Sequence, residues 1–94
     1  MEMLLLTIPD ASALLAKRLR AARKRQGLTQ ADLAAKAMVS VVTIHRLERD
    51  GAGQVTTLLR VLSALGHLRD IDALLQQPEP RTLAELKKLR GGRV

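Results

Sequence analysis

The side chains of this sequence that could do chemistry are mostly cationic. Lysine and arginine number 16 against nine aspartates and glutamates, which gives a formal net charge of +7. A dense group of cations lies just before the Thr29-Gln30 pair: Lys17, Arg18, Arg20, Arg23, Lys24 and Arg25. Most charges on a helix simply face solvent, but this crowding places cations beside the start of the next predicted helix, where phosphate binds readily. The charge balance favours a polyanionic partner, with nucleic acid ahead of a membrane surface.

The groups needed for enzyme or metal chemistry are missing. The sequence has no cysteine, and its two histidines, His45 and His67, lie 22 positions apart. No pair of carboxylates accompanies a histidine, and no glycine-rich phosphate loop follows a strand. We therefore expect neither an enzyme nor a cofactor. The absence of Phe, Tyr and Trp also disfavours single-stranded nucleic acids, whose bases normally stack on aromatic rings.

The stretch from Gly27 to Gly51 predicts two short helices joined by a tight turn. Thr29 followed three residues later by Asp32 is a capping box, so the first of these helices should begin at Gln30. The glycine at each end of the stretch can stop the helix before it. This pair of helices is the element around which the other residues are organised.

The second helix of the pair is predicted from its cap, Ser40, to Asp50. A run of β-branched residues favours a strand here, but the cap before the run and the helix formers after it favour a helix. Ile44 and Leu47 then share one side. Other side chains project elsewhere: Val41, Val42, His45 and Arg46. Two exposed valines are unusual on a solvated face, so we expect this face to meet another surface.

Length and helical patterning predict one all-α domain of five helices. Residues 1–9 should form an N-terminal arm or short strand, and residues 10–77 the helical domain. Residues 78–94 should form a basic tail, bounded by Pro78 and Pro80, with a short helix over 83–90. The apolar run 3–6 is too short to span a membrane, and an acidic residue stands where a signal peptide would place positive charge, so a cytoplasmic protein is expected.

The remaining helices are predicted from caps and leucine spacing. The first should enter at Pro9, with Asp10 or Ser12 as its cap, and should stop at Gly27. The fourth should span 57–65, with an apolar stripe made by Leu58, Leu59, Leu62 and Leu65. The fifth should span 67–75 and point four side chains inward: Leu68, Ile71, Leu74 and Leu75.

The sequence LTQADLAAKAMVSVVTIHRLERDG, followed by TTLLRVLSALG, resembles the Xre-type family of Cro and phage-repressor DNA-binding domains. The resemblance covers about residues 14–75. Four features fall at the positions where the family has them: the T-Q pair that opens one helix, the L-A pair within that helix, the V-S pair before the next helix, and the I-x-x-L-E pattern that ends it. The resemblance implies a lambda-repressor-like fold with a helix-turn-helix, in which the second helix of the motif enters the major groove of double-stranded DNA.

Carried onto this sequence, the resemblance assigns base reading to Val41, Val42 and Arg46. Arginine can pair with the O6 and N7 atoms of guanine, and valine can contact the methyl group of thymine. Burial against another helix is the alternative role for the two valines. DNA-backbone contacts are expected from a polar set: Gln30, Ser40, Thr43, His45 and Arg25. For His45, an ordinary solvated position is an equal alternative.

The resemblance also implies a structural ion pair between Arg23 and Glu48. If the pair is buried, loss of one partner should cost about 3 to 5 kcal/mol, whereas an exposed pair contributes about 0 to 1 kcal/mol. Where the family usually has glycine in the turn, this sequence has Met38. A side chain held in the left-handed region costs about 1 to 2 kcal/mol, so we expect a relaxed turn or a slightly longer helix.

Three functions follow from these observations. The first is a transcription regulator, a repressor that binds a palindromic operator as a homodimer through the fifth helix, with the N-terminal arm or the segment after Pro80 adding contacts. The second is a HipB-type antitoxin, whose residues 80–94 would bind a toxin protein while the domain represses its own operon. The third, a helical interaction module without a DNA site, predicts no steep salt dependence of DNA affinity.

Overall fold

A computed structural model describes residues 6–77 of the 94-residue chain. This part of the chain contains five helices and no strand, in this order: α1 (Ile8–Arg25), α2 (Gln30–Ala37), α3 (Val41–Asp50), α4 (Val55–Ala64) and α5 (Arg69–Ala73). The predicted all-α class is confirmed. The predictions for the first five residues and for a helix over 83–90 fall outside the described residues.

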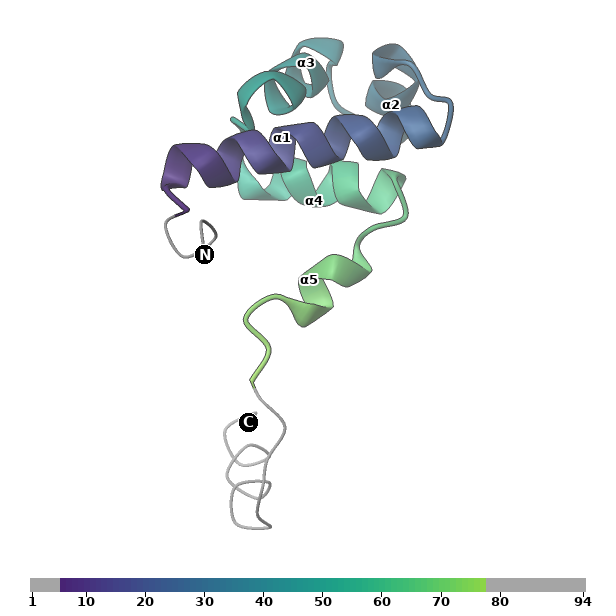
Figure 1. Cartoon of the computed structure of the whole chain (residues 1–94). Helices are drawn as coiled ribbons and strands as arrows, with labels where there is room; N and C mark the ends of the chain where they lie inside the picture. The colour runs from purple at the N-terminus through teal and green to yellow at the C-terminus, as the bar shows by residue number, and fades with distance from the viewer. Residues whose placement is uncertain (1–5, 78–94) are drawn as a thin grey trace.

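The long helix α1 extends along the core, with α3 packed against it (Figure 1). Helices α2 and α3 lie side by side, α4 packs against α2, and α5 stands apart at the end of a short connection. Contacts between helices are made by α1 with α3 and by α2 with both α3 and α4. The helix-turn-helix pair is therefore supported from two directions.

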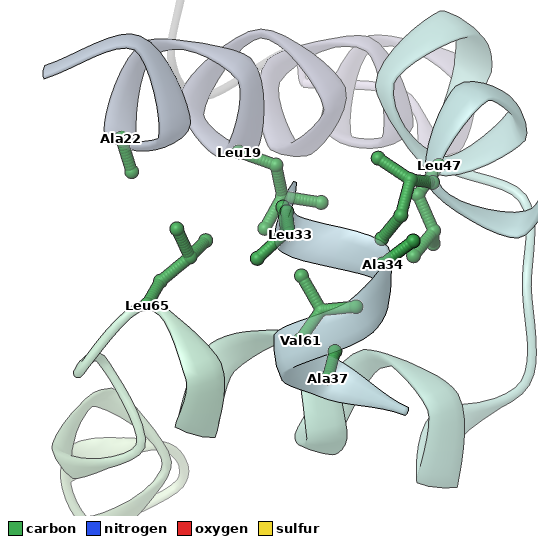
Figure 2. Close-up of a cluster of buried hydrophobic side chains, with 9 residues drawn as sticks. Leu19, Ala22, Leu33, Ala34, Ala37, Leu47, Val61 and Leu65 are labelled. Carbon is green, nitrogen blue, oxygen red and sulfur yellow. The ribbon is translucent and has the colours of Figure 1, made fainter. Parts of the chain in front are cut away.

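The core lies where α1 to α4 meet (Figure 2). Its fully buried large side chains are Leu33, Ile44, Leu47 and Val61. Ile44 and Leu47 are the two residues predicted to anchor α3, and their burial fixes which face of α3 is left exposed. On α4 the centre of the packing is Val61, which is absent from the predicted leucine stripe, with Leu65 beside it. The helix also begins at Val55, two residues before the predicted start.

The predicted start of α1 was wrong. The helix begins at Ile8, and its cap is Thr7, whose hydroxyl accepts a hydrogen bond from the Asp10 backbone N–H at 3.1 Å. The Asp10 carboxylate accepts the Thr7 backbone N–H at 3.3 Å, which completes a capping box. Pro9 lies in the first turn, where no helical hydrogen bond requires a donor, so it is part of the helix and does not delay its start.

The caps of the helix-turn-helix pair are confirmed. Thr29 and Asp32 form the predicted capping box, with hydrogen bonds of 3.0 and 2.9 Å. The Ser40 hydroxyl accepts the Thr43 backbone N–H at 3.1 Å and so begins α3. Gly51 ends α3 in the left-handed region.

The turn between α2 and α3 is neither relaxed nor replaced by a longer helix, contrary to our expectation. Met38 adopts the left-handed conformation, with φ 60° and ψ 45°. Its backbone N–H bonds to the Ala35 carbonyl at 3.2 Å, and the Val39 N–H bonds to the Ala34 carbonyl at 3.0 Å. This is the double hydrogen bond of a Schellman motif, which requires the left-handed residue at this position. The turn therefore has the tight geometry that the family usually makes with glycine.

The prediction for the fifth helix was largely wrong. Helix α5 has only five residues, and none of them is buried. Of the four side chains expected to point inward, Leu68, Leu74 and Leu75 are clearly exposed, the last at 92%. Ile71 and Leu74 line an open groove of about 700 Å³ between α1, α4 and α5. Its apolar lining has no covering element within residues 6–77.

Candidate nucleic-acid interface

The face of α3 opposite the core carries the side chains predicted to read bases. Val41 is 46% exposed and Val42 is 63% exposed, and Arg46 is also exposed. Burial of the two valines against another helix, the alternative considered from the sequence, is not found in the described chain. Because Ile44 and Leu47 hold the other side of α3 in the core, the two valines and the guanidinium of Arg46 are exposed to solvent in the free domain.

The start of α3 is organised by Ser40 and Thr43. Their hydroxyl groups lie 2.8 Å apart and share a hydrogen bond, while the Ser40 oxygen also accepts the Thr43 backbone N–H. These contacts fix the first turn of α3, where the partial positive charge of the helix dipole favours anions. The structure thus places two of the five predicted backbone-contact residues at one helix end.

The structure brings Arg23 of α1 and Glu48 of α3 together. The Arg23 Nε donates to Oε2 of Glu48 at 2.7 Å and Nη2 donates to Oε1 at 2.9 Å, while Nη1 donates to the Leu28 carbonyl at 2.8 Å. The side chains are only 10% and 4% exposed. The hydrogen bond to Glu48 is the main cause that raises the pKa of the Arg23 guanidinium above its ordinary value, so this group stays charged. The pair joins α1 to α3, the helix that carries the exposed valines.

Gln30, the first residue of α2, is connected to the same ion pair. Its side-chain amide donates a hydrogen bond of 3.2 Å to Oε1 of Glu48. The amide is therefore oriented by Glu48, and the start of α2 is held against α3. His45 is exposed on α3 and lies near this junction.

A hollow of about 410 Å³ lies at the junction of α1, α2 and α3 and is lined mainly by charged side chains. We call it the cationic hollow, and its lining residues are Arg20, Arg23, Gln30, His45, Glu48 and Arg49. Arg20 belongs to the group of cations noted in the sequence, but neither Arg20 nor Arg49 was predicted as a DNA contact. The signal was available in the helical spacing, because Arg20 precedes Arg23 by three residues and Arg49 follows His45 by four.

Arg25 does not lie on this side of the molecule. It lines the groove between α1, α4 and α5, together with Arg18. On a helix with about 3.6 residues per turn, Arg25 lies roughly 140° around the axis from Arg20. The structure therefore does not bring Arg25 to the exposed face of α3, where a DNA-backbone contact was expected.

A helix-turn-helix family model, HTH_3, matches residues 19–71, which is more than half of the chain. The chain belongs to this Xre-type family of DNA-binding helix-turn-helix domains. Proteins with this domain are typically DNA-binding proteins without enzymatic activity. No curated protein and no solved structure matches the chain. Within residues 6–77, no helix is both long enough and apolar enough to cross a membrane.

Proposed function

We propose that this protein is a sequence-specific transcription regulator, a repressor that binds a palindromic operator in double-stranded DNA as a homodimer. The observation that carries the proposal is the division of α3 into a buried side and an exposed side. Ile44 and Leu47 fix the helix to the core, and the opposite side presents Val41, Val42 and Arg46. Membership of the helix-turn-helix family supports placing this helix in the major groove.

Each exposed side chain of α3 has a chemical counterpart in the major groove. The guanidinium of Arg46 can donate two hydrogen bonds to the O6 and N7 atoms of one guanine, a contact that contributes about 1 to 3 kcal/mol of discrimination. The methyl groups of Val41 and Val42 can pack on thymine methyl groups. Contact with DNA would thus cover the two valines that are exposed in the free domain.

The ends of α2 and α3 provide the backbone contacts in this proposal. Gln30 stands at the start of α2, and Ser40 with Thr43 at the start of α3. Free backbone N–H groups and the helix dipole favour phosphate at such ends. Contacts of this kind set the position of the protein on DNA, while base contacts provide the sequence preference.

A homodimer is part of the proposal because one recognition helix reads only a few base pairs. Two copies of α3 about 34 to 36 Å apart would read two half-sites one helical turn apart. The exposed apolar side chains Leu68, Ile71 and Leu74, next to the open groove, support a dimer surface at α5.

Selection of bound duplexes from a random-sequence pool tests the proposal. The expected product is a motif with two-fold symmetry and half-sites one helical turn apart. A reporter gene with this motif placed over its promoter should then be expressed less when the protein is present. Recovery of no enriched motif would contradict sequence-specific binding, and increased expression would contradict repression.

The alternative function, a HipB-type antitoxin, stays a prediction. It depends on a toxin contact by residues 80–94, which lie outside the described part of the chain. Truncation after Gln77 separates the two functions, because the antitoxin hypothesis expects loss of toxin capture while DNA binding is largely kept.

A further inference from the structure

The cationic hollow lies beside the exposed face of α3, and of its lining residues the proposed function uses only Gln30. We propose that this hollow binds a phosphate group of the DNA backbone, with Arg20 and Arg49 as ligands that extend the contact from α3 onto α1. This inference rests on the proposed DNA-binding function. It adds ligands from α1 and from the last turn of α3 to the contacts that the base-reading residues and Gln30 provide.

The charges of the lining do not cancel. Three guanidinium groups, those of Arg20, Arg23 and Arg49, face a single carboxylate, that of Glu48. Both oxygens of this carboxylate already accept hydrogen bonds, from Arg23 and from Gln30. Guanidinium groups do not lose their protons at physiological pH, so the hollow keeps an excess of two positive charges without any contribution from His45.

The guanidinium of Arg23 also has N–H groups that its partners in the protein do not engage. A guanidinium carries five N–H groups, and the hydrogen bonds of Arg23 to Glu48 and to the Leu28 carbonyl engage three of them. This side chain is nine-tenths buried and lines the hollow. A phosphate oxygen would give the remaining N–H groups a charged acceptor, which makes a strong hydrogen bond.

Arg49 has a partner in the free protein, but a weak one. It pairs with Asp50 at 3.2 Å, and both side chains are about half exposed or more. An exposed pair of this kind contributes about 0 to 1 kcal/mol, so its guanidinium can turn to another anion at little cost. Arg20 is exposed on α1, and among the described residues it makes no ion pair.

The position of the hollow fits a phosphate at the edge of the major groove. Val42, His45 and Arg49 form one stripe along α3, because they are separated by three and four residues. A phosphate in the hollow would therefore lie next to the valines proposed to contact bases. In helix-turn-helix complexes the helix before the recognition helix crosses the DNA backbone, and here the next helix outward, α1, supplies the further cation.

The salt dependence of DNA affinity tests the two new ligands. The variants Arg20→Gln and Arg49→Gln are compared with Arg60→Gln, which removes the same charge from an exposed position on α4 that lines neither the hollow nor the groove. The dissociation constant of the selected duplex is measured over a series of salt concentrations. The homodimer would present two hollows to the duplex, so each of the first two variants should lower the slope of log affinity against log salt by about 1.8, which is about 0.9 for each phosphate. Arg60→Gln should keep the wild-type slope, and equal slopes for Arg20→Gln and Arg60→Gln would overturn the proposal.

A second measurement separates DNA from free phosphate as the occupant. The Nε–H signals of the arginines are followed by NMR while either the duplex or inorganic phosphate alone is added. The duplex should shift the signals of Arg20, Arg49 and Arg46. A shift of the Arg46 signal without shifts of the Arg20 and Arg49 signals would contradict the assignment of the hollow as a phosphate site, but it would be consistent with the proposed function. No shift of any of the three would contradict the proposed function itself, and a response of the hollow to phosphate but not to duplex would assign it to a free anion.

Discussion

The guanidinium of Arg23 and the carboxylate of Glu48 meet edge to edge, 25 positions apart in sequence, through two hydrogen bonds of 2.7 and 2.9 Å. Arg23 belongs to α1 and Glu48 to α3, one residue after the buried Leu47. The pair therefore fixes the rotation of α3 about its own axis as well as its distance from α1. That rotation decides which side chains α3 presents to DNA.

Replacement of Glu48 by glutamine should be strongly destabilising. It leaves the charge of Arg23 buried without a counter-ion, which costs about 3 to 5 kcal/mol in the free energy of unfolding. Asp50→Asn is the matched control, because the Arg49–Asp50 pair is exposed and its loss should cost less than about 1 kcal/mol. Urea unfolding measures both, and similar costs for the two variants would show that the Arg23–Glu48 pair is not a stabilising link. Since Glu48→Gln can fail to fold, the double variant Arg23→Met with Glu48→Leu should recover stability, because no buried charge is left.

Met38→Gly should stabilise the protein. The methionine holds a left-handed conformation, with φ 60°, that costs a side chain about 1 to 2 kcal/mol. Its side chain is 78% exposed, so little packing is lost with it. Allowing for the entropy of the added glycine, the net gain should be about 0.5 to 1 kcal/mol in thermal or urea unfolding.

Ala35→Gly is the control for Met38→Gly. It places glycine at an exposed position inside α2, where the helical conformation is already relaxed, and should cost about 1 kcal/mol. Opposite signs for the two variants are expected. If both variants destabilised the protein to the same extent, the strain assigned to Met38 would be absent.

Gly51→Ala should destabilise more than Gly66→Ala. Both glycines have positive φ, at 72° and 77°, so alanine at either site should cost about 1 to 2 kcal/mol. At Gly51 a Cβ atom would also lie 2.6 Å from the Ser12 carbonyl oxygen, whereas at Gly66 nothing lies within 4 Å. Because Ser12 belongs to α1, the larger effect at Gly51 reports on how closely the end of α3 approaches α1. Equal losses in unfolding experiments would argue against this close approach.

Asp32 should contribute to the acid sensitivity of the fold. The hydrogen bond from the Thr29 backbone N–H is the main cause that lowers the pKa of Asp32 below its ordinary value of 3.8. A carboxyl group with a lowered pKa in the folded state stabilises the protein above its ordinary pKa, and this contribution is lost as the pH falls through the folded-state value. The thermal midpoint of Asp32→Asn should therefore lie below that of the wild type at neutral pH, with the gap closing in acid. A gap that is independent of pH would contradict the linkage.

Local rules predicted the caps well because a cap depends on residues three positions apart. The Thr29–Asp32 box and the Ser40 cap of α3 were both identified from spacing alone. The Thr7–Asp10 box has the same pattern and was overlooked, because Pro9 was interpreted as the end of the preceding segment. The left-handed conformation of Met38 could not be predicted from the sequence in the same way. The turn is known to be tight because the structure shows the two hydrogen bonds to Ala34 and Ala35.

Features that depend on how helices pack could not be predicted from one sequence. Spacing shows that Arg20 and Arg25 lie on different sides of α1, but it does not show which side meets α2 and α3. For the same reason the leucine pattern of the fifth helix indicated burial, although Leu74 and Leu75 are exposed in the described chain. The exposed side of α3 was predictable because Ile44 and Leu47 define the opposite, buried side. For the cationic hollow, spacing places Arg20 beside Arg23 and Arg49 beside His45, but it does not show that these pairs meet, because three helices contribute to the hollow.

The central claim is that α3 reads DNA bases through its exposed side, and the most direct test is selection of bound duplexes by Arg46→Ala beside the wild type. Arg60→Ala, with the same loss of charge at an exposed position on α4, is the control. Loss of the guanidinium should remove the preference for guanine at one position in each half-site and reduce affinity for the wild-type motif by about 1 to 3 kcal/mol per half-site, while salt-dependent binding to unrelated DNA persists. An Arg46→Ala variant that selects the wild-type motif at full strength would contradict the assignment of α3 as the recognition helix.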